Sequence, residues 1–303
     1  MTGASQGAGP CCTVAVLVTH RAEISDLATV LQALARQVDG VVLVDNGSGL
    51  ERQAEISDLL SNGILGRTPK QILFLPKNAG IGEAQNQGIA LARSQMGADH
   101  ILLSDQDSAP ALDMVFHLHE ALRSLAAESG PVAVVGPDYS ESQRGIATVS
   151  APGSAEVIAR PAVIASGALI PVAAFDAVGG FEAELFMDFV DTEWCFRARA
   201  AGWGCYVSRR AHMAHQIGRP GPRFAGRRMA LHSPERMYYQ LRNLLLLMRR
   251  ATVPRGWGMR MLPRYLIRSL YLSLICAPRL QRVRYVGLGV WHGLCGRSGA
   301  LGA

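Results

Sequence analysis

The feature that most constrains the fold is a regular alternation of short apolar runs with amphipathic segments over residues 13–108. A β-α-β-α succession of this kind builds a parallel sheet with right-handed crossovers, whose ligands bind at the carboxyl ends of the strands. We therefore expect an α/β protein with a mainly parallel sheet flanked by helices. The strands are predicted at 13–20, within 40–49 with a polar turn at its end, within 71–82 together with the following loop, and at 100–108, and the helices are predicted at 23–37, 54–62 and 83–95.

Polar side chains stand where each predicted strand ends. Thr19 follows the first strand, Asp45 the second, Asn78 the third, and two carboxylates at 105–107 the fourth. Because the strands are parallel, these groups meet at one edge of the sheet and form a site of nucleotide size. The loop "GIGEAQ" (80–85) lacks the third glycine of a dinucleotide fingerprint and follows the third strand, which argues against a dinucleotide cofactor.

The tetrapeptide "DQDS" places Asp105 and Asp107 at alternate positions of an extended chain, so both side chains point to the same side. Two carboxylates at a strand end suit a hard divalent cation that keeps waters and takes phosphate oxygens as further ligands. The alternative is a solvated loop in which Asp107 or Ser108 caps a helix before Pro110. The position at a strand end, beside three other polar strand ends, favours the metal site.

Three further acids, Asp188, Asp191 and Glu193, stand in the aromatic and apolar run 186–203. Asp191 starts a predicted helix and would serve as its N-cap if it had no chemical role. Crowded and partly buried carboxylates have raised pKa values, however, and this makes them candidates for a general base. His215 follows a later strand and is a candidate ligand of the metal or the phosphates, although a single histidine is more often structural.

The charge is distributed unevenly along the chain. Residues 1–206 hold 23 acidic and 12 basic side chains, whereas residues 207–303 hold 18 arginines, no lysine and one acid, Glu235. From residue 226 onward the arginines alternate with Leu and Ile at helical spacing, which favours helices lying on an anionic membrane over a merely solvated basic face. Nucleic acid is the rival partner, but stacking aromatics and nucleic-acid-binding motifs are missing.

We find neither a signal peptide nor a run of about 18 apolar residues, so the sequence predicts neither export nor a transmembrane helix. The six cysteines form no C-x-x-C pair, which is typical of a protein from a reducing compartment.

Taken together, these stretches resemble the inverting GT-A glycosyltransferases of family 2, and within them the bacterial rhamnosyltransferases. The most specific matches are "ILLSDQDS" and "FMDFVDTEWCFRARAAGW". The others, in family order over residues 13–250, are "VTHR", "VLVDNGSG", "LPKNAGIGEAQNQGIALA", "SGALIP", "HQIG" and "RMYYQLRNLLLLMRR". The resemblance implies a GT-A catalytic domain at 1–225, followed by an Arg-rich helical membrane-associating region at 226–303.

The resemblance also implies roles for individual residues. The donor nucleotide would be bound by Thr19 and Asp45 at base and ribose and by Asn78 and Gly80 near the diphosphate. Asp105 and Asp107 would hold Mg²⁺ or Mn²⁺, with His215 as a later ligand of the metal or phosphates and Asp105 also reaching the ribose.

The general base at the start of the acceptor-site helix aligns with Asp191. The family often has Glu-Asp there, whereas this chain has Val190-Asp191. Asp188 therefore remains as the supporting acid or as an alternative base.

The function implied is metal-dependent transfer of a sugar, L-rhamnose from dTDP-L-rhamnose, to a polysaccharide acceptor carried on a lipid. The enzyme would be cytoplasmic and peripheral on the inner face of the cell membrane. Three alternatives remain: a family 2 transferase with another nucleotide sugar, a nucleotidyltransferase, and a non-catalytic basic protein that binds membranes or nucleic acid. A nucleotidyltransferase would need a Gly-rich loop after the first strand, and "VTHRAEISD" has none.

Overall fold

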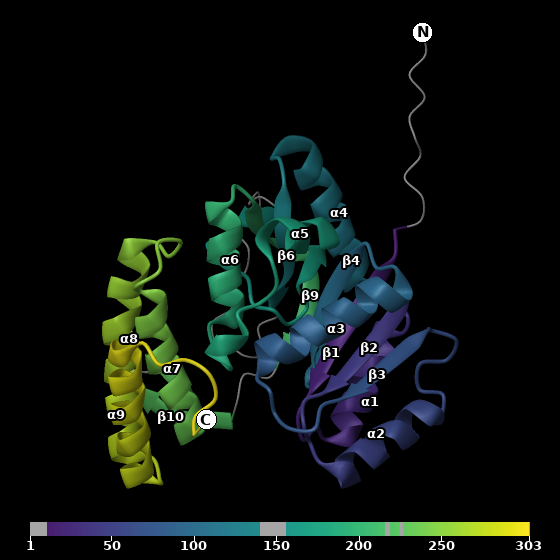
Figure 1. Cartoon of the computed structure of the whole chain (residues 1–303). Coiled ribbons are helices and arrows are strands. Elements are labelled where there is room, and N and C mark those ends of the chain that lie inside the picture. Colours follow the sequence, from purple (N-terminus) through teal and green to yellow (C-terminus); the bar gives the residue numbers. More distant parts are fainter. Residues whose placement is uncertain (1–10, 140–155, 216–218, 225–226, 303) are drawn as a thin grey trace.

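The computed structural model describes residues 11–139, 156–215, 219–224 and 227–302, and only the backbone at 214, 215, 219–224 and 227–230. Its centre is one large sheet with helices on both sides (Figure 1). The strand order is β3 (Lys70–Phe74), β2 (Gly40–Asp45), β1 (Thr13–Thr19), β4 (His100–Asp105), β8 (Leu169–Pro171), β6 (Val132–Tyr139), β9 (Gly204–His215) and β5 (Ser108–Pro110), and β7 (Val157–Ala159) pairs with β9.

The four strands predicted from the sequence are adjacent and parallel, with β1 between β2 and β4. The rest of the sheet is mixed, because β8 runs antiparallel to both β4 and β6, and β5 runs antiparallel to β9. The expectation of a mainly parallel sheet flanked by helices is confirmed.

Both faces of the sheet are covered, which explains why its central strands are apolar throughout. On β1, Val14 and Val16 pack toward one cluster while Ala15 and Leu17 pack toward the other. The first cluster contains residues of α3 (Ile81–Met96), α5 (Val172–Val178) and α6 (Val190–Ala200). The second contains residues of α1 (Ile24–Leu34), α2 (Leu50–Ser61) and α4 (Met114–Glu128).

The C-terminal part forms a further layer of three helices beside α6, shown at the left of Figure 1. They are α7 (Pro234–Leu247), α8 (Arg255–Ile275) and α9 (Arg279–Cys295). A hairpin of β10 (Arg219–Phe224) and β11 (Arg227–Leu231) precedes them. The boundary expected at residue 226 lies outside the described residues, and the first of the three helices begins at Pro234.

The inner helix, α7, is attached to the sheet domain by buried polar groups. Nδ2 of Asn243 lies 2.6–2.9 Å from the carbonyl oxygens of Leu185, Met187 and Asp188, so two amide hydrogens serve three acceptors. Arg242 is fully buried and donates to the same Leu185 carbonyl at 2.9 Å. Because buried carbonyls without donors are costly, this attachment fixes the segment before α6 against α7.

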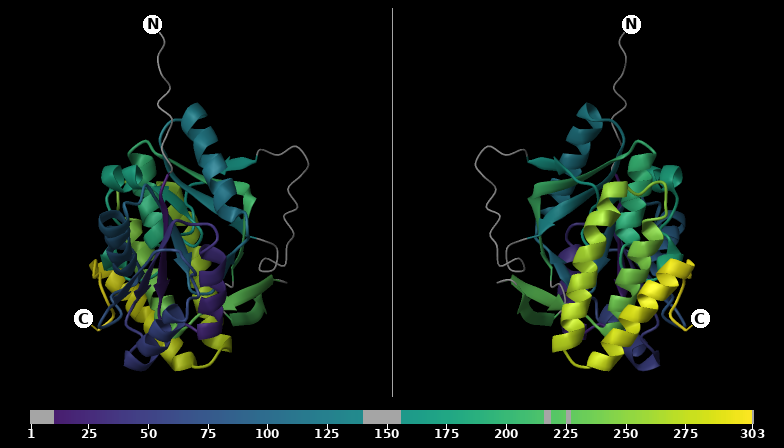
Figure 2. Two further views of the ribbon diagram at one scale, coloured as in Figure 1. Left: turned by 90° about the vertical axis from the view of Figure 1, so that its right-hand side faces the viewer. Right: turned by 90° about the vertical axis from the view of Figure 1, so that its left-hand side faces the viewer.

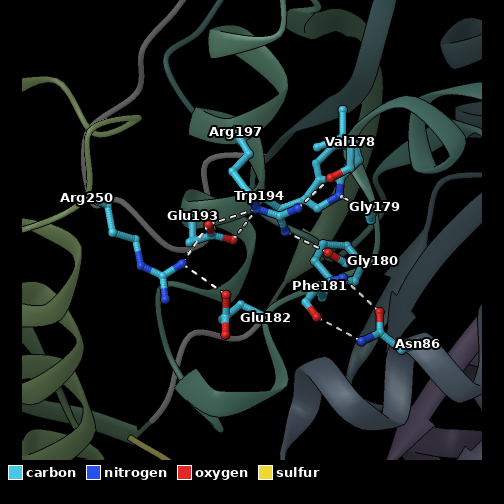
Figure 3. A network of polar contacts seen from close by, with 10 residues as sticks. All are labelled: Asn86, Val178, Gly179, Gly180, Phe181, Glu182, Glu193, Trp194, Arg197 and Arg250. Atoms are coloured by element: carbon cyan, nitrogen blue, oxygen red, sulfur yellow. Dashed lines mark hydrogen bonds and ion pairs between the residues drawn. The ribbon is translucent and has the colours of Figure 1, made fainter. Parts of the chain in front are cut away.

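A second attachment joins the helical layer to α6 (Figure 3). Glu193, only 1% exposed, accepts from Arg197 at 2.9 and 3.0 Å and from Arg250 at 2.8 Å, and Arg250 also reaches Glu182 at 3.1 Å. A buried carboxylate is tolerated when it is paired and hydrogen-bonded in this way. Glu193 is therefore a structural acid that joins α6 to the segment following α7.

Candidate active site

A cavity of about 490 Å³ lies at the carboxyl ends of β1, β2 and β4, where the sequence predicted a ligand site. Of the residues proposed from the sequence, the cavity is lined by Thr19, Asn78, Gly80, Asp105, Asp107, Asp188 and Asp191. Asp45 is not part of the lining, and the side chain of His215 lies outside the described residues. Further lining comes from the segments 164–166 and 186–190, from Arg236 of α7, and from neighbours of the predicted residues, namely Val18, His20, Asn46, Ile81, Gln85 and Gln106.

Asp45 is completely buried behind Thr19. Its carboxylate accepts from the Thr19 hydroxyl at 3.1 Å, from the Ser48 backbone at 3.0 Å and from Nε2 of Gln53 at 3.0 Å. The Ser48 hydroxyl is a further donor to it. With its acceptor sites occupied by donors of its own chain, Asp45 organises the loop after β2 and orients Thr19 toward the cavity.

Two asparagines shape the wall between β2 and α3. The side chain of Asn46 donates to Oδ1 of Asn78 at 3.1 Å and accepts from the Ala79 backbone at 2.8 Å. Oδ1 of Asn78 also accepts from the Gly80 N–H at 2.9 Å. These bonds hold the chain in the sharp turn that starts α3 and leave a polar wall facing the cavity.

The D-Q-D segment connects β4 directly to β5. Ser108 starts β5, and α4 begins only at Met114 after Asp113, so neither Asp107 nor Ser108 caps a helix. Oε1 of Gln106, between the two carboxylates, accepts from the backbone N–H of His20 at 2.7 Å and thereby fixes the segment against the end of β1. This glutamine makes a positioning contact that no local sequence pattern indicates.

The backbone brings His215 close to the D-Q-D segment. β5 and β9 pair antiparallel, and Ser108 is the register partner of His215. The backbone of His215 therefore lies beside the residue that follows Asp107. Among the described side chains no group of three His, Cys, Asp or Glu is arranged to hold a metal ion. The two aspartates of the D-Q-D segment would therefore rely on ligands from a substrate, from water or from His215.

Asp188 and Asp191 differ sharply in their surroundings. Asp188 forms a bidentate ion pair with Arg236, with N–O distances of 3.0–3.1 Å. Asp191 forms no ion pair with any described residue; it accepts from the Thr192 N–H at 2.6 Å and from the Ala165 N–H at 3.3 Å. Asp188 is thus occupied by a cation, whereas Asp191 keeps a carboxylate held only by neutral donors.

Burial raises the pKa of the Asp191 carboxyl above its ordinary value, and the negative charge of Asp188 adds to the rise. The hydrogen bonds from Thr192 and Ala165 act in the opposite direction, because they favour the charged form. A carboxylate with a raised pKa is a stronger proton acceptor than an ordinary surface carboxylate, which suits a general base.

Arg236 is the functional residue that the sequence reasoning missed. Among the described lining residues it is the only lysine or arginine, and it stands against four carboxylates, those of Asp105, Asp107, Asp188 and Asp191. Burial is the largest single influence on the pKa of Arg236 and lowers it, but the charge and hydrogen bonds of Asp188, together with Asp105 and Tyr265, raise the pKa overall. The cavity therefore carries an excess of negative charge. This charge would repel an anionic ligand unless a further cation were present.

The fold places the protein among structures of the GT-A type. TarS (1–349) from S. aureus in complex with UDP-GlcNAc aligns with a TM-score of 0.54 and 17% identity, over 93% of this chain and 81% of that one. Mannosyltransferase PcManGT from Pyrobaculum calidifontis, in complex with GDP-Man and Mn²⁺, aligns with a TM-score of 0.55 and 13% identity, over 95% and 76%. The expected GT-A fold is confirmed.

Residues 15–152 match the model of glycosyl transferase family 2. The chain is also 28% identical over 301 residues to dTDP-rhamnosyl transferase RfbF from Shigella flexneri, covering 95% of this chain and 96% of that protein. Residues 15–152 therefore form a glycosyl transferase family 2 region, the protein is a glycosyltransferase, and over nearly its full length it is similar to a rhamnosyltransferase. The segment around Asp191 and the helix with Arg236 lie beyond the stretch that the family model matches.

The turn before α3 provides a test of how tightly the cavity wall is built. Gly80 has φ +91°, and a Cβ there would lie 2.7 Å from the carbonyl oxygen of Phe186. Gly49, which precedes α2 with nearly the same backbone angles (φ 96°, ψ 161° against φ 91°, ψ 157°), has open space around it. Gly49→Ala is therefore a matched control that carries the backbone strain alone.

We expect Gly49→Ala to lower the free energy of unfolding by about 1–3 kcal/mol from backbone strain. Gly80→Ala should lower it by about 1–3 kcal/mol more, because the added methyl group meets main-chain atoms. Urea unfolding of both variants measures the difference. Equal losses for the two variants would show that the 186 segment can move away from α3.

Proposed function

We propose that the protein transfers L-rhamnose from dTDP-L-rhamnose to a glycan acceptor with inversion at the anomeric carbon. The observation that carries this proposal is one cavity that holds both the D-Q-D carboxylates at the end of β4 and the carboxylate of Asp191 at the start of α6. The similarity to a dTDP-rhamnosyl transferase over nearly the full length supports rhamnose as the sugar. Thr19, Asn78 and Gly80 would contact the donor directly, and Asp45 would act through Thr19.

The residues at the end of β4 fit a divalent cation. Asp107 is exposed and Asp105 half-buried at the cavity, and carboxylate oxygens are the preferred ligands of Mg²⁺ and Mn²⁺. The excess of carboxylates over the guanidinium of Arg236 would repel a nucleoside diphosphate without such an ion. When bound, the ion would neutralise charge on the departing diphosphate. We propose His215 as a further ligand of the metal or phosphates.

Asp191 is the proposed general base. It would take the proton of the acceptor hydroxyl while that oxygen attacks the anomeric carbon, and the nucleoside diphosphate would leave from the opposite face of the sugar. A single displacement of this kind inverts the configuration. The carboxylate of Asp188 is engaged by Arg236, so we assign Asp188 and Arg236 to positioning the turn that leads into α6.

We further propose a lipid-linked saccharide as acceptor and a peripheral location on the anionic inner face of the cell membrane. The Arg-rich region 226–303 would provide the membrane association for a catalytic domain at 1–225, with Arg236 completing the cavity. None of the described helices combines the length and apolar character needed to cross a bilayer. Binding at the membrane surface would therefore use helices that lie on it.

A donor panel tests the proposed reaction. With Mn²⁺ and a rhamnan or lipid-linked acceptor fraction, we expect dTDP-L-rhamnose to be used with a kcat/KM at least about 100-fold above that of UDP-GlcNAc or GDP-mannose. Release of nucleoside diphosphate, measured by a coupled assay, provides the readout. Preference for another donor would select a family 2 enzyme of different specificity, and turnover of none would contradict the assignment of sugar transfer.

Asp107→Asn tests the metal site, with Asp26→Asn on the exposed face of α1 as the matched control. Loss of one carboxylate ligand should weaken Mn²⁺ binding by roughly 10–100-fold, because ligand charge contributes strongly to the affinity of hard cations. Mn²⁺ binding is followed by electron paramagnetic resonance in the presence of dTDP, independently of turnover. Unchanged Mn²⁺ affinity would remove Asp107 from the ligand set.

The pH dependence of kcat/KM tests the roles of Asp188 and Asp191. The base must be deprotonated, so activity rises with pH through the raised pKa of Asp191. Asp188→Asn removes a charge that raises this pKa. The low-pH side of the kcat/KM profile, its acid limb, should therefore move to lower pH by about half a unit to one unit. Arg236→Gln leaves the Asp188 charge uncompensated, and the acid limb should move to higher pH. Shifts in the same direction would exclude Asp191 as the titrating base.

A further inference from the structure

The outermost helices carry a large apolar face that no described residue covers. On α8 it consists of Met259, Ile267, Leu270 and Leu274, which are 56–72% exposed. On the neighbouring α9 it consists of Leu280, Val283, Trp291 and Leu294, which are 53–88% exposed. The spacing of these residues places each set along one side of its helix. We call these eight residues the α8–α9 face; both helices lie in front in the right-hand view of Figure 2.

The α8–α9 face is interspersed with cations and free of acids. Arg260 and Arg264 are exposed on α8, and Arg279 and Arg284 on α9. The sequence has no Asp or Glu after Glu235, so no carboxylate of this region can neutralise them. Eight large apolar side chains exposed on two neighbouring helices mark an interaction site, and the arginines select a partner with negative charge.

We infer that the α8–α9 face docks on an anionic bilayer, with α8 and α9 lying in the interfacial plane. Leu, Ile and Trp side chains would enter the acyl boundary, and the arginines would contact lipid phosphates. A second copy of the chain is the competing occupant. It is disfavoured because two such faces placed together would bring arginine against arginine without an intervening acid.

The inner side of α8 reaches the cavity. Tyr265 and Trp257 of α8 contact Phe189, with ring centroids 5.4 and 5.7 Å apart, and Phe189 lines the cavity two residues before Asp191. One helix therefore provides the lipid-facing surface on one side and supports the wall beside the proposed base on the other. Since a helix with its side chains is about 10 Å across, this wall lies about that far from the docked membrane.

The position of α8 between the membrane and the cavity wall also bears on the acceptor substrate. This inference about the acceptor rests on the proposed function, in which Asp191 receives the acceptor. An acceptor sugar joined to a membrane lipid through a diphosphate would reach Asp191 while its lipid stays in the bilayer. The structure thus points to the acceptor side of the cavity as the side nearest the membrane.

The test is flotation of the full-length protein with vesicles of phosphatidylcholine alone or mixed with phosphatidylglycerol. Leu270→Glu/Leu274→Glu places two acids on the α8–α9 face, and both positions are exposed, so the fold should tolerate them. Leu50→Glu/Phe116→Glu is the control, because these apolar residues are also exposed, at 86% on α2 and 57% on α4. We expect binding that requires phosphatidylglycerol and weakens with salt, at least about a 10-fold loss in the α8 variant, and none in the control.

Equal binding by the α8 variant, or equal binding to both kinds of vesicle, would overturn the docking. So would a dimer in solution that the α8 variant abolishes, because the face would then join two copies. Turnover of donor with a water-soluble acceptor, measured without vesicles, should be the same in the α8 variant and the unaltered protein. Vesicle binding without any turnover would keep the docking and contradict the proposed function, so the two failures are distinguishable.

Discussion

The site is organised around the repulsion among four carboxylates in one cavity. Each pair of like charges raises the free energy of the folded protein unless a cation, a hydrogen-bond donor or a proton offsets it. The fold uses a different means at each place. Arg236 pairs with Asp188, and backbone donors hold Asp191 while burial raises its pKa. At Asp105 and Asp107, the proposed divalent cation would offset the repulsion and also bind a diphosphate.

The same constraint explains why α7 belongs to the site. The turn before α6 contains Phe186, Asp188 and Phe189 at positive φ, a backbone conformation that residues other than glycine rarely adopt. Such a turn persists only where its surroundings determine it. Asn243 binds its carbonyl oxygens and Arg236 binds its carboxylate, so α7 stabilises the strained turn from two sides. Asp191 follows this turn directly, so the contacts between α7 and the turn also fix the position of Asp191.

Sequence reasoning succeeded where local patterns decide the structure. Parallel strands must end at a common edge, so Thr19, Asn78 and Asp107 could be placed together from the order of the strands alone. It could not find contacts that depend on distant segments. Arg236 meets Asp188 across 48 residues of sequence, and Gln106 accepts from the His20 backbone across 86 residues. The antiparallel placement of β8 and β5 likewise lacked a local signal, because both strands are only three residues long.

The arginines of the C-terminal region also divide in a way that composition hides. Arg242 and Arg282 are buried and bind carbonyl oxygens, and Arg250 pairs with Glu182 and Glu193. These side chains serve the fold and cannot contribute to a membrane surface. Arg260 and Arg284, in contrast, stand outside among exposed apolar residues. A region this rich in arginine would therefore serve two separate purposes. Inward arginines attach the helical layer to the sheet, and that attachment would let the outward arginines fix the orientation of the cavity at the proposed membrane surface.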